Sequence, residues 1–252
     1  MGALLVGLAR VTAAMVAALV IFWALSFQTS FLPVLHPLLM VIGFILLTGE
    51  AILAHRTLGR WSRGTRKSAH LALQGAAFSF GIFGIWAKFR ASDGLLSNFL
   101  SLHSWMGLLC LSLFAAQLLA QGEGRRTRGS VLPWHVFVGL YTYGLAVATA
   151  ETGLLEKLTF LQAGRGQGEA AAAAPRSAEA VVVNALGVGL ALLCGVVVLA
   201  AVSPKSGRVG KKTSATAADR SNGDCAAATM SNGDDVANGH HHHRPYLSKQ
   251  QN

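Results

Sequence analysis

Residues Leu35–Leu53 read LHPLLMVIGFILLTGEAIL, an apolar run with a histidine at its start and a glutamate near its end. At a rise of 1.5 Å per residue, a helix of this length crosses about 30 Å of hydrocarbon. An ionisable side chain inside such a span is costly, so His36 is a candidate functional residue. The segment predicts a transmembrane helix that carries a functional histidine close to one membrane surface.

Five more apolar runs surround this one in a chain of 252 residues, of which 52% are hydrophobic and only 13% charged. A soluble domain carries about 25% charged residues. We therefore predict an all-α integral membrane protein of six helices over residues 1–202, followed by a disordered cytosolic tail, 203–252, rich in Gly, Ser, Asn and Lys. The predicted spans are Leu4–Phe27, Leu35–Leu53, Ala69–Phe89, Leu102–Ala120, Val131–Thr152 and Ala180–Val202. We expect the first to be a retained helix and not a cleaved signal peptide, because it is longer than a usual signal-peptide core and contains Arg10.

The net charge of +10 is distributed between alternate loops. Basic residues are dense between the second and third spans, between the fourth and fifth, and after the sixth. Positive loops face the cytosol, so we expect both termini there. No basic face with interleaved aromatic residues is visible, which argues against nucleic-acid binding.

Four histidines recur at intervals of 34, 33 and 32 residues, each opening a different span: His36, His70, His103 and His135. Alternating topology places His36 and His103 at one depth near the non-cytosolic surface. It places His70 and His135 together near the cytosolic surface. The four spans involved form a predicted core over residues 35–155.

Two imidazoles from facing helices suit axial ligation of haem iron. The chain has no CxxCH motif, so the haems would be b-type and held without a covalent bond. Isolated structural histidines, or a zinc site, explain two separated pairs less well, because a zinc site needs clustered ligands at one depth. His55, at the cytosolic end of its helix, is expected to be an interfacial residue.

Four motifs in order carry a resemblance to the cytochrome b561 family, especially its plant branch: LHPLLMVIG around His36, RKSAH around His70, SLHSW around His103 and LPWHVFVG around His135. The resemblance implies six helices, two b-type haems and the same ligand pairs. It further implies an ascorbate-dependent transmembrane oxidoreductase, often a homodimer, in the lipid bilayer of the vacuole or the plasma membrane. Electrons would pass from cytosolic ascorbate to monodehydroascorbate or ferric chelates on the other side.

The resemblance also implies substrate sites. Lys67 and Arg128 match basic positions that bind ascorbate in the family, and Arg66 adds to the same patch. On the opposite face, Arg90, Asn98 and Trp105 are candidates for contact with the acceptor. The chain departs from the family at three places: Gln74 replaces a second histidine of some members, and Arg90 and Leu100 replace a histidine and a tyrosine.

Two alternatives remain. One is a ferric-chelate reductase that uses the same electron path, and the other, of a different class, is a haem-free metal-ion transporter. For the intramembrane carboxylates Glu50 and Glu151, we expect simple pairing with a cation more than a proton relay.

Overall fold

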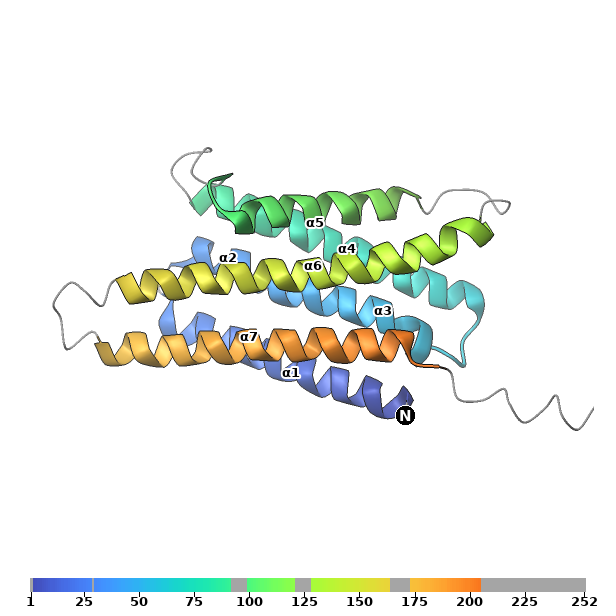
Figure 1. Ribbon diagram of the computed structural model, residues 1–252, viewed down its shortest axis with the longest axis horizontal. Coiled ribbons are helices and arrows are strands. Elements are labelled where there is room, and N and C mark those ends of the chain that lie inside the picture. The colour runs from blue at the N-terminus through green and yellow to red at the C-terminus, as the bar shows by residue number, and fades with distance from the viewer. Residues whose placement is uncertain (1, 29, 92–98, 121–127, 164–172, 205–252) are drawn as a thin grey trace, which may run out of the picture. The chain divides into compact units, whose positions relative to one another are not determined.

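The computed structural model describes residues 2–28, 30–91, 99–120, 128–163 and 173–204, and over these residues it contains helices and no strand (Figure 1). The long helices are α1 (Gly2–Phe27), α4 (Arg63–Ala91), α5 (Leu102–Leu119), α6 (Arg128–Ala163) and α7 (Ala173–Val202). Another span is built from three consecutive pieces, α2 (Phe31–Leu38), the π-helix η1 (Leu39–Leu46) and α3 (Leu47–Thr57). The all-α, six-span fold predicted from the sequence is confirmed.

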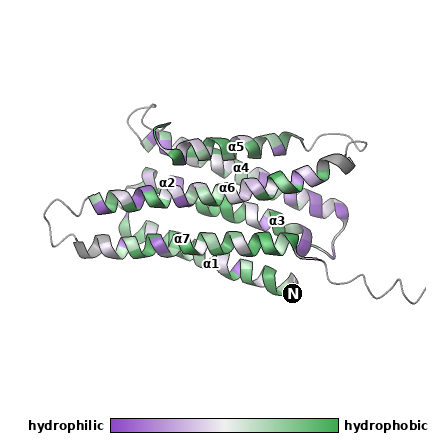
Figure 2. Ribbon diagram, viewed as in Figure 1, coloured by the Kyte–Doolittle hydropathy of each residue, from purple (hydrophilic) through white to green (hydrophobic). Residues whose placement is uncertain are grey.

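Five of these spans are long and apolar enough to cross a membrane. Figure 2 shows hydrophobic residues along most of α1, α5 and α7, whereas α4 becomes hydrophilic toward its N-terminal end. The helix α6 is not among the five, although its 36 residues are more than enough to span a bilayer. Its middle carries Thr142, Thr149, Glu151 and Thr152, which make it more polar than its neighbours.

The helix α6 also extends well beyond the predicted span of residues 131–152. Leu154 and Leu158, in the additional turns, pack against the hydrophobic core. Continued burial of one face stabilises the helix past the point where the uniformly apolar sequence ends.

Proline explains the break in the second span. Pro37 lies inside α2 and has no backbone N–H, so it cannot complete the regular α-helical bonding at that point. The π-helix η1 follows directly. Such irregular turns are frequent at functional sites, and His36 lies three residues before the start of this one.

The core has two parts. The α2–η1–α3 span packs against α4, α5 packs against α6, and α6 contacts η1, which completes the predicted four-helix core. The helices α1 and α7 pack along each other, with Val16, Val20, Leu190 and Val197 fully buried, and α7 also packs against α6.

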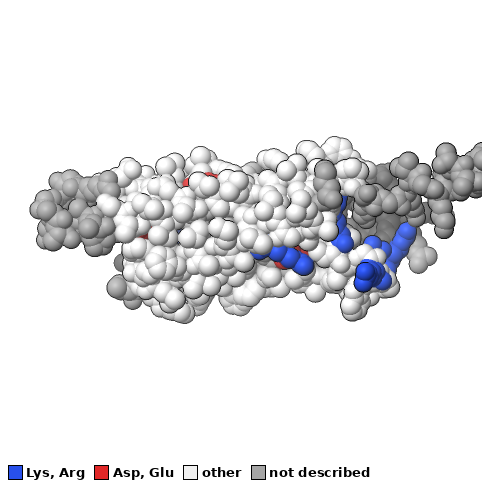
Figure 3. All heavy atoms as spheres, turned by 90° about the horizontal axis from the view of Figure 1, so that it is seen from below, with Lys and Arg blue, Asp and Glu red and all other residues white. Residues whose placement is uncertain are grey.

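The start of α1, the turn between α3 and α4, and the end of α7 all lie at one end of the bundle, here called the terminal end (Figure 1). Arg56 connects α3 to the end of α7 by donating hydrogen bonds to the backbone carbonyls of Ala201 and Ser203. On the face drawn in Figure 3, Lys and Arg gather toward the same end, and most of the remaining described surface carries no charge. The predicted tail, 203–252, lies outside the described residues except for Ser203 and Pro204.

Candidate cofactor-binding site

The structure brings His36 of α2 and His103 of α5 together, with their ring centroids 6.1 Å apart and their planes at 83°. The Nδ1 atom of His36 lies 2.9 Å from the carbonyl oxygen of Gly84 on α4. The Nδ1 atom of His103 lies 2.8 Å from the carbonyl oxygen of Thr149 on α6. Each ring is therefore oriented by the backbone of a neighbouring helix.

His70 of α4 and His135 of α6 form the second pair, with ring centroids 6.1 Å apart and planes at 77°. The Nδ1 atom of His70 lies 2.8 Å from the carbonyl oxygen of Ala51 on α3. His135 differs from the other three, because its neighbour is a side chain: the amide of Gln117 lies 3.1 Å from Nδ1 of His135.

The hydrogen bonds to carbonyl oxygens determine which ring nitrogen carries the proton. A carbonyl only accepts, so Nδ1 of His36, His70 and His103 is the donor and Nε2 keeps its lone pair. Nε2 of His70 is buried and has no hydrogen-bond partner among the described residues. An imidazole held in this way by its Nδ1–H is the usual form of a metal-binding histidine.

The spacing of both pairs suits one metal ion between two rings. Rings 6.1 Å apart at their centres leave room for an ion bound at about 2 Å by a nitrogen on each side. Within the described ranges, no group of three or more His, Cys, Asp or Glu side chains gathers as a metal-ion site would require. The arrangement is two separate pairs.

A cavity of about 170 Å³ lies beside His36 and His103. Its walls are largely apolar and include Phe44, Leu111 and Gly107. Gly81 and Gly107 line this cavity, whereas an added Cβ at Gly43 would lie only 2.5 Å from Phe80. Gly43 therefore serves helix packing.

Three buried polar atoms without a described partner lie on one stripe of α4: Nε of Arg66, Nε2 of His70 and Oε1 of Gln74. Residues four apart share a helix face. A buried polar group without a partner is destabilising, so the stripe marks a face suited to a polar or metal-containing ligand. His55, expected only as an interfacial residue, is exposed, and its ring centroid lies 5.1 Å from that of His70.

The structure describes the side chains of only some of the residues that are predicted to bind substrate. At the terminal end, Lys67 is exposed and Arg66 is half-buried, while the side chain of Arg128 lies outside the described residues. At the opposite end, Arg90 is exposed and Asn98 lies outside the described residues. Trp105 is also exposed, and its Nε1–H donates to the carbonyl of Phe99 at 3.1 Å.

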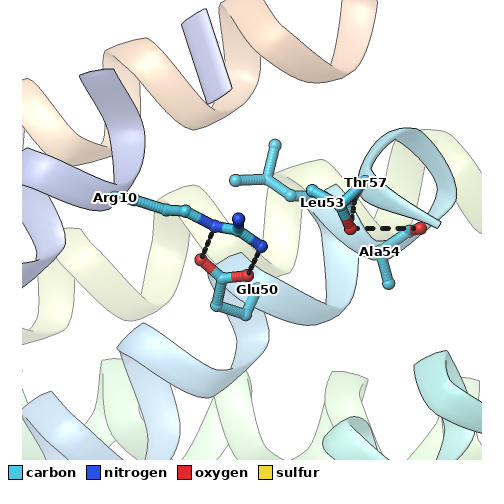
Figure 4. Close-up of polar contacts among 5 residues, drawn as sticks. All are labelled: Arg10, Glu50, Leu53, Ala54 and Thr57. Atoms are coloured by element: carbon cyan, nitrogen blue, oxygen red, sulfur yellow. Dashed lines mark hydrogen bonds and ion pairs between the residues drawn. The ribbon is translucent and has the colours of Figure 1, made fainter. Parts of the chain in front are cut away.

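The two intramembrane carboxylates behave differently. Glu50 accepts two hydrogen bonds from Arg10 of α1, at 3.2 Å from Nε and 3.1 Å from Nη2 (Figure 4). The simple pairing expected for Glu50 is thus observed. Glu151 does not show it, because its Oε1 is buried without a partner among the described residues.

Sequence reasoning missed a polar cluster that joins three helices. Glu179 of α7 is buried, and its Oε1 lies 3.0 Å from each of Trp23 Nε1, Gln28 Nε2 and Lys157 Nζ. The only signal in the sequence is one acidic residue at the start of an apolar run, and its partners are far away along the chain.

The family model described as eukaryotic cytochrome b561 matches residues 35–161, which contain the four histidines of the two pairs. The chain is 55% identical over 210 residues to "Probable transmembrane ascorbate ferrireductase 4" of Arabidopsis thaliana, covering 80% of this chain and 86% of that protein. It is 41% identical over 217 residues to "Transmembrane ascorbate ferrireductase 2" of the same plant, covering 79% and 91%. It is 36% identical over 213 residues to "Probable ascorbate-specific transmembrane electron transporter 2" of Oryza sativa subsp. japonica, covering 78% and 87%.

Proposed function

Because the chain belongs to the eukaryotic cytochrome b561 family, we propose that its two histidine pairs bind two b-type haems that relay electrons through the bilayer. The protein is a transmembrane oxidoreductase that transfers electrons from ascorbate, and its family depends on haem. The proposal adds where the cofactors bind and how the protein holds them.

The observation that carries the proposal is the matched geometry of the two pairs. His36–His103 and His70–His135 have the same centroid separation, and in both pairs the rings come from different helices. The Nδ1–H of His36, His70 and His103 is held by a carbonyl, which leaves Nε2 for iron. The buried, unpartnered Nε2 of His70 fits a ligand role, because a metal bond would satisfy it.

A bis-histidine haem accepts and gives up one electron at a time without needing an open coordination position. The chain's own residues supply the environment for this chemistry. Hydrogen bonds from Nδ1 to carbonyls of neighbouring helices fix the ring orientation and raise ligand basicity. Apolar walls, such as Phe44 and Leu111, exclude water from the cavity beside His36 and His103.

We assign the terminal end to the cytosol, with His70 and His135 forming the cytosolic site and His36 and His103 the non-cytosolic site. The support is the concentration of Lys and Arg in the loops at the terminal end. Both termini would then face the cytosol. The vacuolar membrane and the plasma membrane both remain candidate locations.

Ascorbate is an anion at neutral pH, and Lys67, Arg66 and Arg128 are its proposed contacts. Lys67 is exposed three residues before His70. Nε of Arg66 is buried without a described partner, on the same face of α4 as His70. A cation patch beside the cytosolic haem would hold the donor within reach of its electron acceptor.

Monodehydroascorbate or a ferric chelate is the proposed acceptor at the opposite end, where Arg90, Asn98 and Trp105 are candidate contacts. Arg90 and Trp105 are both exposed, as contact with a substrate in water requires. Ferric-chelate reduction as the main role is favoured by the names of the Arabidopsis relatives. A homodimer is proposed as the working assembly.

The test is a visible spectrum of the purified protein, oxidised and then reduced with ascorbate, together with a haem-to-protein ratio. We expect two b-type haems per chain, at least partly reduced by ascorbate. Substitution of His36 or His103 by alanine should remove one haem, and substitution of His70 or His135 the other. A colourless protein after expression with added haem would overturn the proposal and support the metal-transporter alternative.

Acceptor kinetics then separate the two electron-transfer roles. Vesicles that contain the protein in their membrane would be loaded with ascorbate. Ferric citrate or monodehydroascorbate would then be added outside. A kcat/KM that is at least tenfold higher for one acceptor, a difference of about 1.4 kcal/mol in transition-state free energy, would identify the main role.

A further inference from the structure

The cavity beside His36 and His103 changes from apolar to polar toward the non-cytosolic surface. Its inner walls include Phe44, Cys110 and Ala146. Its other end includes Lys88, three residues before the end of α4, and Ser104, in the first turn of α5. A flat apolar ligand with carboxylates at one edge would match this distribution of side chains.

Among the described residues that line the cavity, Lys88 alone has a Lys, Arg, Asp or Glu side chain. It follows Gly84 by one helical turn, and the carbonyl of Gly84 orients His36. Neither of the two ion pairs formed among the described residues involves Lys88. Lys88 is exposed, and without a described acidic partner its ammonium group can bind an anionic ligand at the edge of the apolar cavity.

We propose that Lys88 binds a propionate of the non-cytosolic haem, with the hydroxyl of Ser104 as a second polar contact, so that the propionate edge faces the non-cytosolic surface. The inference rests on the proposed function, because it requires a haem between His36 and His103. It goes further by assigning the orientation of the cofactor and a residue that holds its carboxylates.

A simpler role for Lys88 is anchoring, in which a lysine near the end of a span extends its ammonium group to the lipid headgroups. The two roles have different consequences for the haem. A cation at the haem edge favours the reduced state, because the incoming electron lowers the net positive charge of the site. Anchoring places the ammonium group among the headgroups, where water and salt screen its charge, so the electron affinity of the haem would change little.

The experiment compares Lys88→Met, Lys88→Arg and the matched control Arg90→Met in the haem-loaded full chain. Arg90 lies two residues later on the same helix, is exposed, and does not line the cavity. Midpoint potentials of both haems are measured by spectroelectrochemistry without ascorbate or acceptor. The haem lost in His36→Ala identifies the non-cytosolic signal, and transfer of haem to apomyoglobin measures retention.

We expect Lys88→Met to lower the midpoint potential of the non-cytosolic haem and leave the cytosolic haem unchanged. It should also release the non-cytosolic haem about fivefold faster, the factor typical of one exposed ion pair. Lys88→Arg should stay close to wild type, and Arg90→Met should change neither potential. Should Lys88→Met not accumulate, Lys88→Gln removes the same charge with less change in polarity.

Unchanged potential and retention in the charge-removing variant would overturn the inference. A change confined to KM for ferric citrate would also overturn it, because Lys88 would then contact the acceptor. Failure of the proposed function is distinguishable from both outcomes, since wild type itself would then lack two haems.

Discussion

At the scale of single residues, the position of a histidine ring depends on the size of the residues beside it. An added Cβ at Gly153 of α6 would lie 2.9 Å from Cε1 and 3.0 Å from Nδ1 of His103. Such a contact forces the ring to move. Gly144, on the same helix, has no atom within 4 Å of an added Cβ and provides a matched control.

We expect Gly153→Ala to disturb the low-spin EPR signal of the non-cytosolic haem and to lower its occupancy. Gly144→Ala should leave both haem signals as in wild type. Equal spectra for the two variants would contradict the close approach of α6 to His103.

The Arg10–Glu50 pair gives a second prediction at this scale. Arginine keeps its charge in proteins. Glu50→Gln leaves the guanidinium of Arg10 without its carboxylate and should therefore lower stability by up to about 2–3 kcal/mol, the cost of an unpaired charge within the hydrocarbon. The double variant should be more stable than Glu50→Gln alone. Thermal unfolding in detergent, analysed as a double-mutant cycle, checks the order.

At the scale of elements, the cluster around Glu179 joins α7 to α1 and α6. All three donors point to one carboxylate oxygen, and Glu179→Gln replaces it with a neutral amide oxygen and removes the charge that balances Lys157. We expect a loss of roughly 1–3 kcal/mol, the range for hydrogen bonds to a charged group. Glu156→Gln, on α6 next to Lys157, is the control. Equal melting temperatures for the two variants would mean that the cluster does not hold these helices together.

The sequence predicted the helices better than their irregularities. Uniform apolar runs determine spans, because hydrocarbon requires every backbone group to be bonded within the helix. The π-helix η1 could not be predicted, because a helix can continue past Pro37 in more than one backbone conformation, and packing determines which one forms. The extra turns of α6 were missed for a related reason: packing of Leu154 and Leu158 stabilises them, and the sequence there is less uniformly apolar.

The histidine pairs could be predicted because topology and spacing fix the depth of each ring, and the structure brings the expected partners together. The groups that orient the rings could not, because a carbonyl such as that of Gly84 or Ala51 has no signature in the sequence. The proposed role of Lys88 could not be predicted either, because it depends on a cavity that only the folded helices create.

At the scale of the whole molecule, the end of α7 closes the terminal end of the bundle. Arg56 donates to the carbonyls of Ala201 and Ser203. A chain cut after Pro204 should keep both proposed haems and wild-type thermal stability, because every described helix and both contacts of Arg56 remain. A chain cut after Ala200 loses both acceptors and should melt at a lower temperature. A large loss of haem on cutting after Pro204 would show that the tail contributes to the fold.

The orienting bonds of His36, His70 and His103 run to main-chain carbonyls, which every amino acid possesses. No single substitution can delete such an acceptor, so the orientation of these three rings tolerates sequence change as long as the helices keep their positions. His135, beside the amide of Gln117, is the exception. For the proposed haem between His70 and His135, a substitution at position 117 is therefore a route by which natural variation can retune one site and leave the other intact.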